Sequence, residues 1–125
     1  MTGKKVLVVD DDEASRSLLR LHLTNAGYAV LLAEDAVAAG RVIYGSPPDL
    51  LIVDVELPYL NGLEFAATMM ADATAPQVPV ILITAYERFV EQAQILGVEC
   101  LIKPFYLHQL LESVARTLEK SAQWR

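Results

Sequence analysis

Five short apolar runs, each about as long as a buried β-strand, alternate along this chain with segments of helical periodicity. The runs lie at about 5–10, 28–33, 49–54, 78–84 and 98–102. Strands that are apolar along their whole length are typical of a parallel sheet whose two faces are both covered by helices. The alternation therefore predicts an α/β fold: a doubly wound, five-stranded parallel sheet with helices on both faces.

The segments between the runs carry the signals that begin and end helices. A helix over about 13–26 is expected to end at Gly27, because glycine readily adopts the left-handed conformation. Its predicted apolar face consists of Leu18, Leu19, Leu23 and Ala26. Asp35 is expected to cap a second helix that runs to about 43 and breaks at the Gly-Ser-Pro-Pro segment 45–48.

Three more helices are predicted from the same spacing, over about 63–72, over about 86–96, and after the fifth strand. The last helix has a clear amphipathic stripe, formed by Leu107, Leu110, Leu111, Val114 and Leu118. The 125 residues therefore read as one domain over 1–125, with its core at about 5–118. The residues after the last helix are too few for an output domain.

Composition narrows the classes of protein that fit. The chain is 54% hydrophobic and carries a net charge of −6, which disfavours direct binding to nucleic acid or to anionic lipid. No apolar run approaches the length of a membrane span, and Met1–Lys5 leaves no room for a signal peptide. The one cysteine excludes an internal disulfide. We therefore expect no membrane insertion and a cytoplasmic location.

Polar residues stand where four of the predicted strands end. Asp10 and Asp11 follow the first strand, Asp54 the third, Thr84 the fourth and Lys103 the fifth. Because the carboxyl ends of parallel strands lie at one edge of the sheet, and ligands bind beyond that edge, we expect these side chains to converge. Two or three carboxylates with one hydroxyl and one ammonium suit a divalent cation and a phosphoryl group.

The chemistry of these groups suggests a division of roles. Magnesium usually takes one or two protein carboxylates and keeps several waters, so one of Asp10 and Asp11 is expected to bind it directly and the other through water. Asp54 is suited to be a second ligand and a nucleophile toward phosphorus. Lys103 and Thr84 would neutralise and hydrogen-bond the phosphoryl oxygens.

Each residue also has a simpler structural interpretation. Asp12 fits best as the cap of the first helix, with Ser15 nearby. Thr84 would also serve as the cap of the helix that follows it, and Lys103 as a surface lysine. The same polar pattern at the ends of four strands favours a shared site over these separate roles.

These residues resemble the response-regulator receiver domain of two-component signalling, over about Lys5 to Leu118. The shared motifs are Val8-Val9-Asp10-Asp11-Asp12, Asp54 with Leu57-Pro58 and Asn61-Gly62 after it, Thr84-Ala85, and Lys103-Pro104-Phe105. The resemblance implies a flavodoxin-like strand order, 2-1-3-4-5, and a cis peptide bond between Lys103 and Pro104.

For the site, the resemblance implies that Asp54 accepts a phosphoryl group from a phosphohistidine. The expected Mg²⁺ (or Mn²⁺) ligands are Asp11, Asp54 and the backbone carbonyl of Glu56, with Asp10 acting through water. Thr84 and Lys103 would contact the phosphoryl oxygens. The implied donor is a sensor histidine kinase or a histidine phosphotransfer protein, and phosphorylation would switch binding to a downstream protein. A homodimer through the last helices is also compatible with the family.

Three residues at or near the site bear on how the signal would be transmitted. The aromatic switch residue, three positions before the lysine, is replaced by Cys100, which cannot report by a ring flip. Tyr86 is a candidate substitute, but a surface tyrosine at the start of a helix is the favoured interpretation. Glu56 places an extra carboxylate near the site, where it would raise metal affinity, repel the phosphoryl group or position water for its loss.

Three other functions fit the sequence less well. An aspartate-nucleophile phosphatase of the haloacid-dehalogenase kind needs an Asp-x-Asp followed closely by threonine, and Asp10 and Asp12 match only the spacing. A flavin-binding module would use hydroxyl-rich loops where this chain has three aspartates. A receiver-like binding module that has lost phosphorylation is disfavoured by the complete set of site residues. We therefore expect a signalling protein, not an enzyme, that catalyses only its own phosphorylation and dephosphorylation.

Overall fold

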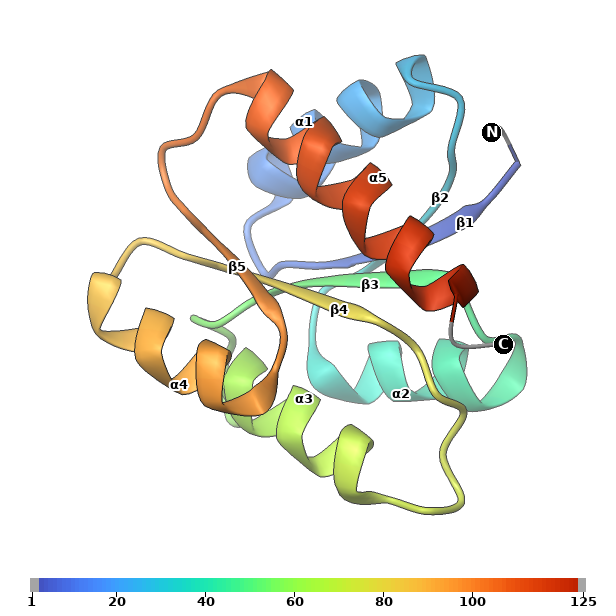
Figure 1. Cartoon of the computed structure of the whole chain (residues 1–125), viewed down its shortest axis with the longest axis vertical. Coiled ribbons are helices and arrows are strands. Elements are labelled where there is room, and N and C mark those ends of the chain that lie inside the picture. The colour runs from blue at the N-terminus through green and yellow to red at the C-terminus, as the bar shows by residue number, and fades with distance from the viewer. Residues whose placement is uncertain (1–2, 124–125) are drawn as a thin grey trace.

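Strands and helices alternate through the described part of the chain, residues 3–123 of a computed structural model (Figure 1). The elements are β1 (Lys5–Val9), α1 (Glu13–Asn25), β2 (Ala29–Ala33), α2 (Ala36–Gly45), β3 (Leu50–Asp54), α3 (Gly62–Ala71), β4 (Val80–Thr84), the 3₁₀ turn η1 (Glu87–Phe89), α4 (Val90–Leu96), β5 (Glu99–Ile102) and α5 (Leu107–Gln123). The two residues at each end of the predicted domain, 1–2 and 124–125, lie outside the described residues.

The five strands form one parallel sheet in the order β2-β1-β3-β4-β5, which confirms the predicted order. The pairing register joins Val9 to Val53, Asp54 to Ile83 and Thr84 to Ile102. The carboxyl ends of β1, β3, β4 and β5 are thereby aligned, so residues that follow these strands begin their loops side by side.

Two apolar clusters fill the space on the two faces of the sheet. On one face α1 and α5 pack against the sheet, and on the other lie α2, α3 and α4 (Figure 1). Successive residues of a strand point to opposite faces, so Leu51 and Val53 join the second group of helices while Leu50 and Ile52 join the first. β1, β3 and β4 are buried on both faces, which explains their continuous apolar sequence.

The predicted helix caps are confirmed. Asp12 accepts a hydrogen bond from the Ser15 amide at 3.0 Å, and Asp35 accepts one from the Ala38 amide at 2.8 Å. Gly27 follows α1 with φ +100°, the left-handed conformation that the prediction required. These contacts satisfy amide groups at helix starts, which no earlier turn can bond.

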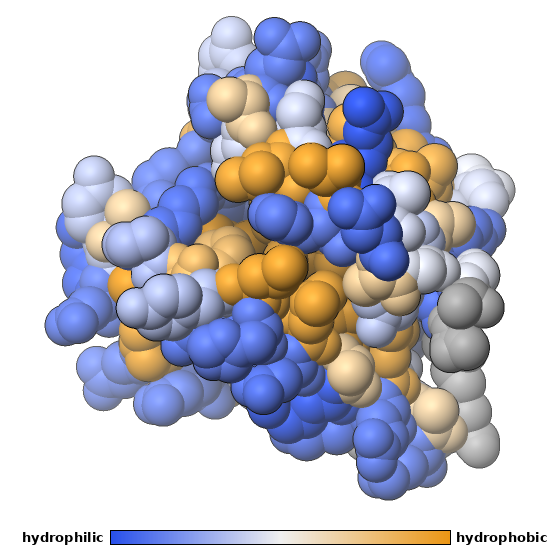
Figure 2. All heavy atoms as spheres, turned by 90° about the horizontal axis from the view of Figure 1, so that it is seen from above, coloured by the Kyte–Doolittle hydropathy of each residue, from blue (hydrophilic) through white to orange (hydrophobic). Residues whose placement is uncertain are grey.

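The predicted apolar face of α1 is partly wrong. Leu19 and Leu23 are buried, but Leu18 is 55% exposed and Ala26 is exposed beyond the end of the helix. Leu18 lines the rim of a hollow of about 300 Å³ between α1 and the start of α5. Figure 2 shows this face, with apolar side chains gathered at its middle. The helices here are too far apart to cover the whole apolar stripe.

The stripe on α5 also differs from the prediction, at its N-terminal end. Leu110 and Val114 are buried as expected, but Leu107 is 44% exposed. Towards its C-terminal end the helix turns small polar residues to the protein instead, namely Ser113, Thr117 and Ser121. Small side chains allow α5 to lie close to the sheet.

Two predicted helix boundaries are corrected. The helix expected over 63–72 begins at Gly62, because Asn61 caps it by accepting from the Glu64 amide at 2.8 Å. The helix expected over 86–96 is regular only from Val90, and η1 precedes it. Tyr86 is extended there (φ −121°, ψ 122°), with its amide donating to Thr84 Oγ1 at 3.1 Å.

In the described part of the chain, no helix is both long enough and apolar enough to cross a membrane.

Candidate functional site

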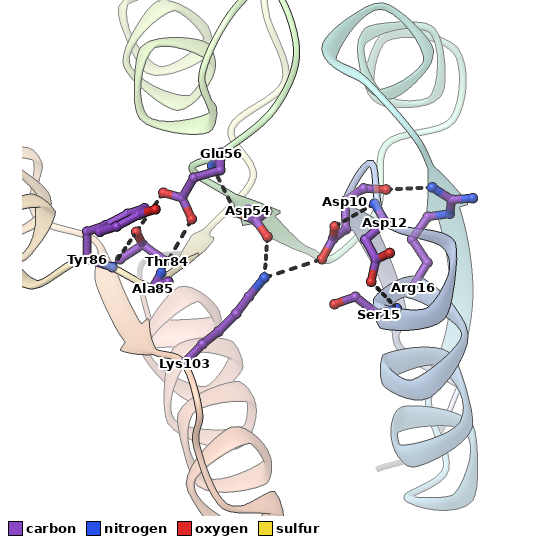
Figure 3. Close-up of polar contacts among 10 residues, drawn as sticks. All are labelled: Asp10, Asp12, Ser15, Arg16, Asp54, Glu56, Thr84, Ala85, Tyr86 and Lys103. Atoms are coloured by element: carbon purple, nitrogen blue, oxygen red, sulfur yellow. Dashed lines mark hydrogen bonds and ion pairs between the residues drawn. The ribbon is translucent and has the colours of Figure 1, made fainter.

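The residues predicted at the strand ends come together at one edge of the sheet (Figure 3). Asp10 follows β1, Asp54 ends β3, Thr84 ends β4 and Lys103 follows β5. The first three are almost completely buried, with exposed fractions of 2%, 4% and 0%, whereas a third of the lysine side chain is exposed. The site is therefore a set of buried polar groups with one cation at its opening.

Lys103 links the two buried carboxylates. Its Nζ lies 2.5 Å from Asp54 Oδ2 and 3.8 Å from Asp10 Oδ2. Partial burial alone would lower the pKa of Lys103, but the hydrogen bond to Asp54, helped by the charges of Asp10 and Glu56, raises it above its ordinary value. The side chain therefore remains an ammonium and neutralises part of the local negative charge.

Asp54 is held at both of its oxygens. Oδ1 accepts from the Glu56 amide at 2.8 Å, and Oδ2 accepts from Lys103. Burial raises the pKa of Asp54 to about 6, although both hydrogen bonds act in the opposite direction. A carboxylate with this pKa is mostly ionised near neutral pH and is oriented by two donors, as a nucleophile requires.

The three aspartates after β1 have different environments. Asp10 points inward, and its Oδ1 accepts from the Asp12 amide at 2.9 Å. Asp11 and Asp12 are exposed, and Asp12 caps α1. Arg16 donates from Nη1 to the Asp10 carbonyl oxygen at 2.7 Å, a contact that the sequence analysis did not anticipate. The sequence signal that could have predicted this contact is the position of Arg16, one turn into the helix that follows the three aspartates.

The side chain of Glu56 reaches across to the end of β4. Thr84 Oγ1 donates to Glu56 Oε2 at 2.7 Å, and the Ala85 amide donates to Oε1 at 3.3 Å (Figure 3). Thr84 Oγ1 accepts in turn from the Tyr86 amide. Thr84 therefore helps to shape the turn after β4, and its one proton is committed to Glu56. It does not cap the following helix, as its simpler interpretation suggested, because η1 and α4 begin without a side-chain cap.

The loop from β3 to α3 sets the position of Glu56. The amides of Leu57 and Gly62 both donate to the Val55 carbonyl, at 3.0 and 2.8 Å. A Cβ atom added at Gly62 would lie only 2.1 Å from the Asp54 carbonyl oxygen. Glycine is therefore required here by the close approach of the backbone, which draws α3 against the strand that carries Asp54.

Cys100, which replaces the aromatic switch residue, and Tyr86, its candidate substitute, differ in their surroundings. Cys100 is half-buried against the cluster under α2, α3 and α4, and burial with the nearby Glu56 charge raises the pKa of its thiol. Tyr86 is 46% exposed, with the Arg88 guanidinium 4.3 Å from its ring centroid. This placement agrees with the favoured interpretation of a surface tyrosine. The Lys103–Pro104 peptide bond is cis.

The carboxylates at this site suit Mg²⁺, which binds to few protein oxygens and completes its coordination with water and phosphate. Asp10 and Asp54 converge on one cation, Lys103, and Asp11 stands exposed beside them. Within residues 3–123, no three acidic, histidine or cysteine side chains lie close enough to hold a metal by themselves. Magnesium does not need such a cage, since it binds through few carboxylates and retains waters.

Comparison with known proteins finds a matching domain family. The sequence model of the family described as "Response regulator receiver domain" matches residues 6–115. The response regulator MprA of Mycobacterium ulcerans is 37% identical over 120 residues, which are 94% of this chain and 51% of that protein. The chain thus spans about half the length of the curated relatives it matches.

Solved structures show the same fold. The chemotaxis response regulator CheY4 of Vibrio cholerae has a TM-score of 0.82 at 28% identity, covering 93% of this chain and 99% of that one. The response regulator TrrA of Thermotoga maritima, solved in complex with Mg²⁺-BeF, has a TM-score of 0.82 at 31% identity, covering 91% and 98%. The receiver domain of a Pseudomonas aeruginosa sensor histidine kinase, with magnesium coordinated in its active site cleft, has a TM-score of 0.82 at 26% identity, covering 94% and 99%.

Proposed function

The chain belongs to the response regulator receiver domain family, and on that premise we propose that it accepts a phosphoryl group from a phosphohistidine onto Asp54. One observation carries the proposal. The Asp54 carboxylate is buried and accepts hydrogen bonds from Lys103 and from the Glu56 amide. It lies at the same edge of the sheet as Asp10 and Thr84. This arrangement suits the attack of a carboxylate on phosphorus.

In the proposed reaction, an oxygen of Asp54 attacks the phosphorus atom of the phosphohistidine. The O–P bond forms as the P–N bond breaks, and the imidazole leaves with the electron pair of that bond and takes up a proton. Lys103 remains charged and neutralises the phosphoryl oxygens as they approach, and Thr84 supplies a hydrogen-bond donor. Phosphoryl transfer depends mainly on positioning and on such charge neutralisation.

We propose Mg²⁺, or Mn²⁺ in its place, as the cofactor. Asp11, Asp54 and the backbone carbonyl of Glu56 would hold it directly, and Asp10 through water. When bound, the ion supplies positive charge to the phosphoryl oxygens. The cleft magnesium of the Pseudomonas receiver domain and the Mg²⁺-BeF complex of TrrA support magnesium as the ion.

The proposed phosphodonor is a sensor histidine kinase or a histidine phosphotransfer protein in the cytoplasm. The apolar hollow between α1 and α5 includes Lys103, so a partner that docks there brings its histidine close to Asp54. The net charge of −6 supports a protein as downstream partner and disfavours nucleic acid. We also propose that the domain can form a homodimer through its last helices. Beyond its own phosphorylation and dephosphorylation, we assign the domain no catalysis.

The test is incubation with acetyl phosphate and magnesium, followed by intact-mass measurement. The wild-type chain should gain one phosphoryl group, and Asp54→Asn none. Asp12→Asn is the matched control, because asparagine also caps helices and the change in charge is the same. If wild type and Asp54→Asn are modified alike, the assignment of Asp54 is wrong. Repeated hydrolysis of an external phosphate ester would favour the phosphatase alternative.

A further inference from the structure

The Glu56 carboxylate occupies the two hydrogen-bond donors at the end of β4. Its two oxygens accept from the Thr84 hydroxyl at 2.7 Å and from the Ala85 amide at 3.3 Å. Thr84 is fully buried and Glu56 half-buried, so this contact is only partly open to water. An anion with two oxygens thus bridges a hydroxyl and the adjacent amide.

A phosphoryl group on Asp54 would need the same donors. A threonine hydroxyl has one proton and a backbone amide has one, so neither can donate well to two acceptors at once. While Glu56 holds both, a phosphoryl oxygen finds no free donor on β4. The two anions are therefore mutually exclusive partners of Thr84.

Electrostatics oppose their coexistence as well. A phosphoryl group brings a charge of about −1.5 to −2 near neutral pH, and Glu56 lies two residues from Asp54, with its amide bonded to Asp54 Oδ1. Like charges in a half-buried site are screened less than at an open surface. The Glu56 side chain is only half-buried, and its carboxylate contacts the exposed Ala85, so water is close to it.

We propose that Glu56 is a resident competitor: it holds the Thr84 hydroxyl and the Ala85 amide before phosphorylation, and the phosphoryl group on Asp54 expels it. This inference rests on the proposed function, because it requires phosphorylation of Asp54. Of the three roles left open for Glu56, it selects repulsion of the phosphoryl group, and it adds competition for the hydrogen-bond donors.

The moving element is then the β3–α3 loop and not the fifth strand. Cys100 is small and half-buried, so it has no ring to move into the space beside Thr84. Glu56 begins a loop whose tip, Tyr59, is fully exposed and has a left-handed backbone (φ 70°). Release of the Glu56 carboxylate removes the side-chain contacts that tie this loop to the end of β4.

The first measurement is the rate of phosphorylation by acetyl phosphate at saturating magnesium. Glu56→Ala should react about tenfold faster than wild type, because its Thr84 hydroxyl and Ala85 amide are free. Glu56→Gln keeps an acceptor oxygen without the charge, so its rate should lie in between. Glu64→Gln, an exposed glutamate on α3, makes the same charge change and should react at the wild-type rate.

The second measurement follows the carboxylate itself. In NMR spectra of chain labelled with ¹³C at the glutamate carboxyl groups, the resonance that disappears in Glu56→Gln identifies Glu56. It should move when the wild type is phosphorylated, and the Glu64 resonance should stay in place. This readout does not depend on a rate.

The outcomes separate this inference from the proposed function. If the Glu56 variants react like Glu64→Gln and the Glu56 resonance does not move, the competitor role is wrong, while uptake of one phosphoryl group by wild type still supports Asp54 as acceptor. A slower reaction in Glu56→Ala also overturns it, because the carboxylate would then assist the reaction. If wild type takes up no phosphoryl group, the proposed function fails first.

Discussion

The Lys103 ammonium lies 2.5 Å from Asp54 Oδ2, so the nucleophile and its neutralising cation are paired in the resting site. The two residues are 49 positions apart in sequence. Asp54 ends β3 and Lys103 follows β5, and these two strands do not pair with each other. β4 lies between these two strands, so the contact spans its carboxyl end. The same ammonium also lies 3.8 Å from Asp10, which follows β1. Removing this cation should affect both stability and chemistry.

Lys103→Met should destabilise the fold by about 2 kcal/mol, because two buried carboxylates lose their cation. The second substitution Asp54→Asn should recover at least about 1 kcal/mol, since one of those charges is then gone. Urea unfolding of the wild type, both single variants and the double variant measures this coupling. Additive effects would show that the ion pair contributes nothing to stability.

Asp11 and Asp12 should separate metal binding from helix capping. Asp12→Ala removes the cap of α1 and should cost about 1 kcal/mol of stability, with magnesium affinity changed less than about twofold. Asp11→Ala should weaken magnesium binding by about tenfold or more with little effect on unfolding, because the side chain is exposed. Calorimetric titration and urea unfolding measure the two effects. The reverse pattern would exchange the two assignments.

Gly62→Ala should be strongly destabilising because its Cβ would lie 2.1 Å from the Asp54 carbonyl oxygen. Overpacking of this kind costs about 3 kcal/mol, and it should also slow phosphorylation by moving Asp54. Gly40→Ala is the control, since nothing lies within 4 Å of a Cβ in the middle of α2. It should raise stability by roughly 0.5–1 kcal/mol. Equal effects on thermal unfolding would contradict the close approach.

The Glu99–Arg116 pair should make stability depend on pH. Arg116 Nε and Nη2 donate to the two Glu99 oxygens at 2.7 and 2.9 Å, and Ser113 Oγ donates to Oε1 at 2.6 Å. The Arg116 hydrogen bond lowers the pKa of Glu99 below its ordinary 4.5. Because the folded pKa is the lower one, the stabilisation is present above about 4.5 and disappears as the pH falls through the folded value.

Glu99→Gln should therefore cost about 1 kcal/mol near neutral pH and much less at about pH 3. Urea unfolding at several pH values measures the difference from wild type. Glu119→Gln, at an exposed position of α5, the helix that carries Arg116, is expected to show no such trend. A constant difference across pH would mean that the carboxylate charge contributes nothing.

The fold was predictable because its signals are local. Strands buried on both faces, such as Leu50–Asp54, need continuous apolar sequence, and the caps Asp12 and Asp35 act within three residues of their own position. The errors lie where neighbours decide burial. Periodicity placed Leu18 and Leu107 in the core, yet the spacing of α1 and α5 leaves both exposed beside a hollow.

The sequence by itself determined which chemical groups stand at the edge of the sheet, because parallel strands present their carboxyl ends together and each strand end could be located from its apolar run. It did not determine which of those groups touch. Glu56 bonds Thr84 across 28 residues, and Arg16 reaches the Asp10 carbonyl. Only the tertiary structure decided these contacts, because they depend on the register of neighbouring strands and on loop conformations that local propensity does not encode.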